Sequence, residues 1–187
     1  MSDKNYLHEY WELIQKSIRE FDPMLLEPAV VLVRDTYLSD RQIFTIGNGG
    51  SAAIAVHLAA DFGKNITKPG GKFPRIMSLC TNSSTLTALG NDCGYDETFA
   101  FQLRNFMNPN DLLIAISSSG NSPNIVKGVE YARENGAKVI GMSGFNGGKL
   151  KELADISLHV PMKIYEVVED MHSIFCHAII HAIKFGL

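Results

Sequence analysis

Two pairs of an imidazole and a carboxylate are the residues of this chain whose types and spacing could do chemistry. His57 and Asp61 are four residues apart in an expected helix, so they share one helix face. Glu169 and His177 are eight positions apart in an expected final helix, about 12 Å along its axis. If the two helices pack side by side, the four groups form a set suited to zinc or a similar divalent metal.

Two other interpretations of these four residues remain open. Each histidine alone is more often a satisfied core or interface residue than a metal ligand. Without a metal, two close carboxylates would repel each other, and one of them would bind a proton. That state would supply a base and an acid, so a metal-free acid–base site is the alternative to a zinc site.

A glycine-rich turn in the same region could hold a phosphate. The β-type run 42–46 is followed by Gly47, Gly49 and Gly50, which permit a tight turn and close approach of the backbone. The unpaired N–H groups of the next helical turn lie at the positive end of the helix dipole and favour an anion. The turn also matches the loose dinucleotide pattern G-x-G-x-x-G/A. However, the next expected strand is not followed by the acid that would hold a ribose.

A second polar turn, Ser-Ser-Ser-Gly-Asn-Ser-Pro at 117–123, follows the most apolar expected strand. Its four hydroxyls, together with backbone donors, fit a phosphate monoester. A plain turn with a serine N-cap is the alternative, and the second glycine-rich turn upstream favours phosphate binding. Asn91 and Asp92 follow a short helical pattern and could meet a sugar hydroxyl, or could simply end that helix.

The elements that must position these groups alternate between strand and helix from residue 41. Strands are expected at 42–46, 75–80, 111–117, 138–143 and 156–161. Helices are expected near 50–64, 83–90, 96–107, 123–135, 147–154 and 165–185, with a surface loop at 65–74. The apolar strands and the alternation predict an α/β fold with a doubly wound, five-stranded parallel sheet of flavodoxin-like order. Ligands then bind at the carboxyl ends of the strands.

Two amphipathic helices, at 5–20 and 24–38, precede the sheet. Packing against a partner subunit is slightly favoured for them over simple covering of the sheet edge. Together with the final helix they present more apolar faces than five strands can cover. We therefore expect a homo-oligomer, with a tetramer favoured and the active site near a subunit boundary. The 187 residues predict one domain, 1–187, with N-terminal helices at about 4–39 and a sheet core at about 41–187.

Composition excludes several classes of partner. The formal net charge is −3 and no block of Lys and Arg is present, so neither a nucleic acid nor an anionic membrane is expected as partner. No run of 18 apolar residues exists, and the polar start lacks the apolar region of a signal peptide. Three cysteines without C-x-x-C spacing favour reduced thiols and a cytoplasmic location.

Taken together, the motifs resemble the sugar isomerase (SIS) domain family, and within it the branch of phosphoheptose isomerases. The resemblance runs from about residue 25 to the end of the chain. It is carried by Gly47-Asn48-Gly49-Gly50-Ser51, His57 with Asp61, Gly90-Asn91-Asp92, the serine turn 117–122, Ser143-Gly144-Phe145-Asn146-Gly147-Gly148, and Glu169-Asp170-Met171-His172 with His177.

This resemblance implies a homotetrameric isomerase that converts sedoheptulose 7-phosphate to D-glycero-D-manno-heptose 7-phosphate. The substrate contacts that it implies are Asn48, Gly49, Gly50, Ser51, Asn91, Asp92, Ser117, Ser118, Ser119, Ser122 and Glu169. The zinc ligands that it implies are His57, Asp61, Glu169 and His177. The catalytic residues that it implies are Asp61, His177 and Glu169.

Two residues depart from the family pattern and leave the identity of the base open. Asp61 stands where the family has a glutamate, its usual base, and Glu169 stands where it has a glutamine. Either carboxylate could therefore remove the proton that aldose–ketose isomerisation moves between adjacent carbons. A non-catalytic SIS module that binds a sugar phosphate or a partner protein is the alternative function. The retained acids and both histidines favour the enzyme.

Overall fold

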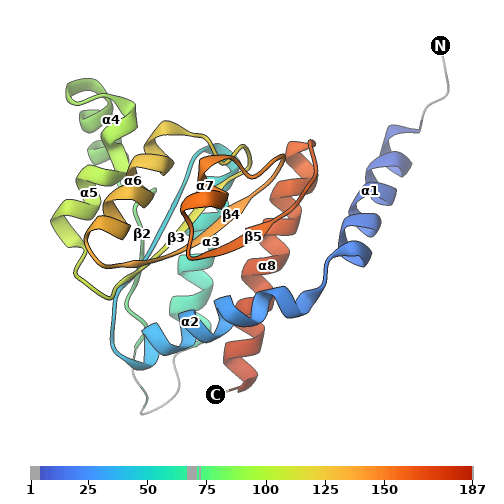
Figure 1. Ribbon diagram of the computed structural model, residues 1–187, viewed down its shortest axis with the longest axis horizontal. Helices are drawn as coiled ribbons and strands as arrows, with labels where there is room; N and C mark the ends of the chain where they lie inside the picture. Colours follow the sequence, from blue (N-terminus) through green and yellow to red (C-terminus); the bar gives the residue numbers. More distant parts are fainter. Residues whose placement is uncertain (1–4, 67–70, 72, 187) are drawn as a thin grey trace.

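The computed structural model describes residues 5–66, 71 and 73–186 of the chain. Five parallel strands form one sheet in the order β2-β1-β3-β4-β5 (Figure 1). The strands are β1 Ile43–Gly47, β2 Ile76–Ser78, β3 Leu112–Ser117, β4 Lys138–Ser143 and β5 Ile156–His159. Every position of β1 and β3 is buried, as expected for parallel strands covered on both faces. The predicted α/β class and strand order are confirmed.

Helices connect the strands where the sequence pattern predicted them. They are α1 Tyr6–Glu20, α2 Glu27–Leu38, α3 Gly49–Asn65, α4 Ser83–Asp92, α5 Thr98–Phe106, α6 Pro123–Glu134, α7 Gly148–Leu153 and α8 Tyr165–Gly186. Two short 3₁₀ helices, η1 Pro23–Leu26 and η2 Tyr95–Glu97, precede α2 and α5. The predicted surface loop 65–74 falls largely on residues outside the described part of the chain. Over the described residues, no helix has the length and apolar character needed to cross a bilayer.

The side chains of β3 alternate between two hydrophobic cores, one on each face of the sheet. Leu112, Ile114 and Ile116 pack in a core formed with α2, α3 and α8. Leu113 and Ala115 pack in the opposite core, formed with α5, α6 and α7. Figure 1 shows these two helical layers on either side of the sheet. The layering places the amino ends of α3, α6 and α8 beside the carboxyl ends of the strands.

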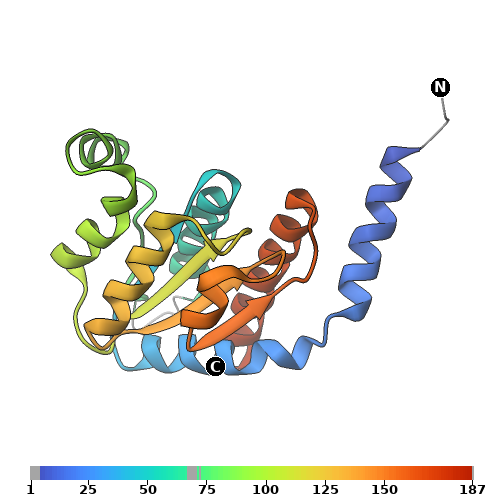
Figure 2. The same ribbon diagram turned by 45° about the horizontal axis from the view of Figure 1, so that its top comes forward.

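Helix α1 lies at the side of the molecule and contacts only part of it (Figure 2). The Tyr10 hydroxyl on α1 donates to the carboxylate of Asp170 on α8. Phe21, just after α1, packs against Phe175 of α8 with the ring centroids 4.4 Å apart. Leu7 is nevertheless 77% exposed and Trp11 61% exposed. The outer face of α1 is therefore apolar and open to solvent.

Candidate active site at the carboxyl ends of the strands

The glycine turn after β1 adopts the tight backbone that its sequence predicts. A Cβ atom on Gly47 would collide with the carbonyl of Ser51, so only glycine allows α3 to start this close to β1. Gly49 has φ +53°, in the left-handed region that favours glycine. Asn48 is the N-cap residue of α3, but its side chain makes no capping hydrogen bond there. The Asn48 side chain instead hydrogen-bonds to the side chains of Asn124 and Tyr95.

The serine turn lies between β3 and α6 and keeps its hydroxyl groups free of capping. Ser122 is the N-cap residue of α6 and makes no side-chain capping bond. The Ser122 hydroxyl lies 3.3 Å from the Ser117 hydroxyl. Ser118 Oγ is buried and has no hydrogen-bond partner among the described residues. These hydroxyls are therefore available to a bound anion.

The two turns share a small cavity of about 150 Å³ at the carboxyl edge of the sheet. The residues that line it are Asn48, Ser51, Ile116, Ser117, Ser118, Ser119, Ser122, Tyr165 and Glu169. We call this cavity the serine pocket. Its polar lining and the two helix amino ends beside it suit a phosphate group. Six of the substrate contacts predicted from sequence, together with Glu169, therefore lie in or at one pocket.

Glu169 is the acid of the serine pocket. A Cβ atom on Gly50 would collide with the Glu169 carboxylate, so the glycine at that position allows the carboxylate to lie against the start of α3. Burial raises the pKa of Glu169 above its usual value, and the nearby charges of Glu166 and Asp170 raise it further. A carboxylate with a raised pKa is a stronger base once it is ionised, as proton abstraction from carbon requires.

A third glycine-containing loop supports the serine turn from behind. Gly120 has φ +66°, and a Cβ atom there would collide with the carbonyl of Gly147. The Leu150 N–H donates to the Gly120 carbonyl at 2.9 Å, and the Gly144 N–H donates to the Ser118 carbonyl at 2.9 Å. The segment 143–148, which the family resemblance quoted as a motif, thus holds the shape of the serine turn.

A second cluster brings together three of the four predicted metal ligands. The Nε2 atoms of His57 and His177 are 2.9 Å apart, and Oδ2 of Asp61 lies 3.4 Å and 3.6 Å from them. Ligands of a tetrahedral zinc ion, each about 2.0–2.1 Å from the metal, are about 3.3 Å from one another. The three atoms therefore match one face of a zinc site and leave a fourth position open, as in catalytic sites.

The structure does not bring Glu169 to this cluster within one chain. Glu169 precedes His177 by eight residues of α8, about 12 Å along the helix axis. Its carboxylate faces Gly50 at the start of α3, whereas His177 faces His57, two turns further along. Because α3 and α8 pack side by side, Glu169 and Asp61 lie at different levels along the contact between these two helices.

Asn91 and Asp92 also lie apart from the serine pocket. They end α4, are exposed, and hydrogen-bond to each other at 2.7 Å. Tyr165, which sequence reasoning missed, does line the pocket, and its ring packs edge-on against Phe145 at 4.8 Å between centroids. The only sequence signal for Tyr165 was an aromatic residue at the start of the final helix, beside the strand ends.

Comparisons with known proteins show the family that this chain is similar to. The sequence pattern of the SIS domain family matches residues 5–144. The chain is 43% identical to the phosphoheptose isomerase of Rhodospirillum rubrum over 150 residues, which cover 80% of this chain and 79% of that protein. It is 44% identical to the phosphoheptose isomerase of Aliarcobacter butzleri over 155 residues, covering 82% and 81% of the two proteins.

Solved structures give the same result. The phosphoheptose isomerase of Neisseria gonorrhoeae superposes with a TM-score of 0.82 at 32% identity, covering 96% of this chain and 95% of that one. The phosphoheptose isomerase of Francisella tularensis superposes with a TM-score of 0.89 at 26% identity, covering 99% and 100%. The likeness therefore extends over the sheet and all its connections.

Proposed function

The chain belongs to the SIS domain family, and we propose that it is a sugar-phosphate isomerase that converts sedoheptulose 7-phosphate to D-glycero-D-manno-heptose 7-phosphate. The observation that carries this proposal is the serine pocket, a cavity lined by five serines and by Glu169. The names of the relatives support the choice of a seven-carbon sugar over a shorter one.

The serine pocket would hold the phosphate end of the sugar. Neutral hydroxyl donors and the amino ends of α3 and α6 bind a phosphate without needing a basic side chain. Binding energy from the phosphate orients the reacting carbons. Because the phosphate is on C7 and the reaction is at C1 and C2, the sugar must fold back for C1 to reach Glu169 at the same pocket.

We assign the proton transfer between carbons to Glu169. In the direction from ketose to aldose, this carboxylate accepts a proton from C1 and returns it to C2, through an enediol. A second group moves a proton from O1 to O2. Within one chain His177 lies about 12 Å from Glu169 along α8, so our candidate for this step is the His177 of a neighbouring subunit. Asp61, which contacts both His57 and His177, is left to orient these imidazoles or to hold a metal.

We propose zinc as the metal of the cluster formed by His57, Asp61 and His177. The donor set of two imidazoles and one carboxylate, with its three short separations, fits that ion. When bound, the ion would supply a Lewis acid for negative charge that develops on the sugar oxygens.

We propose that the active site is completed in a homo-oligomer, with a tetramer favoured. Within one chain the cluster lies about 12 Å from Glu169 along α8, and Asn91 and Asp92 lie outside the serine pocket. In an oligomer, a neighbouring subunit could bring its own metal cluster, or its own Asn91 and Asp92, to the serine pocket of this chain. The whole chain, 1–187, is our proposed functional unit. Its three free cysteines support a cytoplasmic location.

The proposal is tested by assaying the purified protein on ketose phosphates of five, six and seven carbons, with and without added zinc. We expect turnover that is fastest with the seven-carbon sugar and that is strongly reduced by Ser119→Ala. Ser173→Ala, which changes a hydroxyl on α8 outside the serine pocket, is the matched control and should stay active. Tight sugar-phosphate binding without turnover on any substrate would instead indicate a non-catalytic binding module.

A further inference from the structure

We propose that Tyr95 is a positioning residue that holds the Asn48 side chain in place, so that its amide offers a hydrogen-bond donor to the sugar phosphate. The inference rests on the proposed function, because it takes from it that Asn48 contacts the substrate. Tyr95 lies in η2, which is distant in sequence from the glycine turn, and it was not among the residues predicted from sequence.

Asn48 and Asn124 form a reciprocal amide pair between the glycine turn and the first turn of α6. Asn48 Nδ2 donates to Asn124 Oδ1 at 2.8 Å, and Asn124 Nδ2 donates to Asn48 Oδ1 at 2.9 Å. Exchanging the oxygen and nitrogen of both amides together would leave both hydrogen bonds intact. The pair alone therefore does not decide which atom of Asn48 is an acceptor and which is a donor.

A backbone group outside the pair determines which atom of each amide is the acceptor. The backbone N–H of Ile125 donates to Asn124 Oδ1 at 3.0 Å, and because a backbone N–H can only donate, it fixes the Asn124 amide. Asn124 then fixes the Asn48 amide through the reciprocal pair. The Tyr95 hydroxyl donates to the resulting acceptor, Asn48 Oδ1, at 2.9 Å and holds the side chain in place. One hydrogen of the Asn48 amide then has no acceptor among the described residues, at a side chain that lines the serine pocket.

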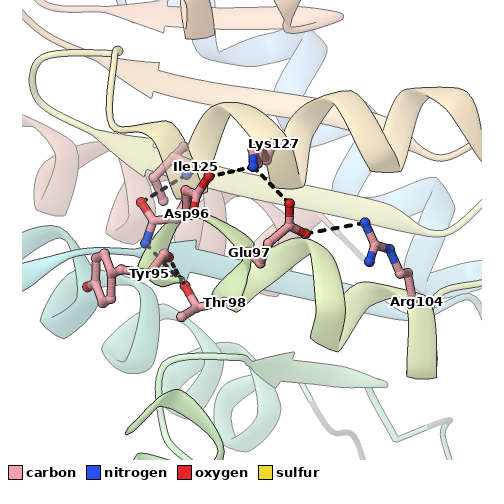
Figure 3. Close-up of polar contacts among 8 residues, drawn as sticks. Tyr95, Asp96, Glu97, Thr98, Arg104, Ile125 and Lys127 are labelled. Atoms are coloured by element: carbon pink, nitrogen blue, oxygen red, sulfur yellow. Dashed lines mark hydrogen bonds and ion pairs between the residues drawn. The ribbon is translucent and has the colours of Figure 1, made fainter. Parts of the chain in front are cut away.

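The segment that carries Tyr95 is held in place by polar contacts of Tyr95, Asp96 and Glu97 (Figure 3). Thr98 Oγ1 donates to the Tyr95 carbonyl at 2.8 Å. Lys127, on α6, forms ion pairs with Asp96 and with Glu97, the latter at 2.8 Å. These contacts hold η2 against α6, the helix that carries Asn124. The two side chains that bind Asn48, Tyr95 and Asn124, are therefore fixed relative to each other.

The orientation matters because the substrate is an anion. With its amide hydrogen toward the pocket, Asn48 stabilises a phosphate or sugar oxygen. With the amide reversed, its carbonyl oxygen would face those oxygens and repel them. Asn48 is also the N-cap residue of α3, but its side chain makes no capping bond. The side chain is therefore free to hydrogen-bond to Tyr95 and Asn124 beside the pocket.

Steady-state kinetics of Tyr95→Phe on sedoheptulose 7-phosphate test the inference. We expect KM to rise about 5- to 10-fold, the usual value of one hydrogen bond, with kcat within about twofold of the wild type. Tyr131→Phe is the matched control, because Tyr131 lies on α6 and packs against Arg104 outside the serine pocket. That control should keep the wild-type KM.

A double-mutant cycle separates action through Asn48 from a general structural effect. In an Asn48→Ala background, Tyr95→Phe should change KM by less than about twofold, since its only route to the substrate has been removed. An unchanged KM in the single variant Tyr95→Phe would overturn the inference. So would a full additional effect of Tyr95→Phe in the Asn48→Ala background.

NMR of the side-chain amides keeps this inference distinguishable from the proposed function. If the wild type does not turn over any sugar phosphate, the proposed function fails, but the effect of Tyr95 on the Asn48 amide can still be measured. The Asn48 side-chain NH₂ signals should shift and exchange faster with water in Tyr95→Phe, and stay unchanged in Tyr131→Phe. Asn48 signals that are identical in wild type and Tyr95→Phe would overturn the inference.

Discussion

Glu169 and Asp61 are both carboxylates of the candidate site, but their surroundings suit them to different chemical roles. Glu169 faces the hydroxyl-lined serine pocket, and burial raises its pKa. Asp61 contacts two imidazoles, those of His57 and His177. The first environment suits proton transfer to and from carbon, and the second suits a metal ligand or an orienting group.

Replacement of Glu169 by glutamine, the residue usual in the family at this position, tests the assignment of the base. We expect Glu169→Gln to lower kcat by about 10²- to 10⁴-fold, because the amide cannot accept the proton from C1. Glu152→Gln, an exposed change on α7, is the control and should keep the wild-type kcat. If Glu169→Gln stays active and Asp61→Asn does not, the base is Asp61.

Removal of one imidazole tests the metal cluster. Protein purified without chelator should contain close to one zinc per chain by elemental analysis, and His57→Ala should lose it, because two ligands hold the ion poorly. His8→Ala, an exposed change on α1, should keep the metal. Full activity in the presence of a chelator, with no metal found, would indicate the metal-free acid–base site instead.

At the level of elements, the serine turn depends on the loop that supports it. Gly120→Ala should destabilise the fold by about 1–3 kcal/mol, since alanine is strained at φ +66° and its Cβ would collide with Gly147. The affinity of the Gly120→Ala variant for phosphate should also be lower than that of the wild type. Gly63→Ala, inside α3, has ordinary contacts and should be neutral or stabilising by up to about 1 kcal/mol. Urea denaturation and phosphate titration of the two variants check both expectations.

Helix α8 carries a buried histidine that makes stability depend on pH. Burial lowers the pKa of His172 to about 4, below its ordinary value of 6.5. The unfolded chain therefore binds a proton that the folded chain does not, and stability falls as pH drops from 6.5 toward 4. Between pH 7 and pH 5 this group should remove about 2 kcal/mol of stability.

Denaturation curves at the two pH values measure the His172 effect directly. His172→Gln should lose less stability on acidification than the wild type, by about that amount. His181→Gln, an exposed change on the same helix, is the control and should keep the wild-type pH dependence. Equal pH dependence in the wild type and in His172→Gln would show that the folded-state pKa is not lowered.

The sequence was enough to predict the strands and the two turns that follow β1 and β3, because each depends on local pattern. The alternation of strands and helices was enough to predict the strand order. The buried run of β3 and the glycines at 47, 49 and 50 are signals of this kind. The sequence already put Glu169 and His177 about 12 Å apart along the final helix, but it could not show that Glu169 faces Gly50 and that His177 faces His57. Those contacts are set by helix packing. The contact of Tyr95 with Asn48 joins residues 47 positions apart, so no local pattern reports it.

At the scale of the whole molecule, the outer face of α1 supports the proposed assembly. Light scattering should give the mass of a tetramer at micromolar concentration. Trp11→Glu, which places a charge on a residue 61% exposed in the single chain, should shift the protein toward smaller species. Glu12→Gln, at an exposed position of the same helix, is the control. A monomeric wild type would contradict the proposed oligomer.

Sugar-phosphate isomerisation by the whole molecule is tested most directly by NMR of sedoheptulose 7-phosphate incubated with the wild-type protein and zinc in D₂O. The signals of D-glycero-D-manno-heptose 7-phosphate should appear, with deuterium at C2, because the proton held by the base exchanges with solvent before it returns to carbon. The Glu169→Gln variant should form this product far more slowly. A folded wild-type protein that leaves the ketose unchanged, with or without zinc, would contradict the assignment of an isomerase.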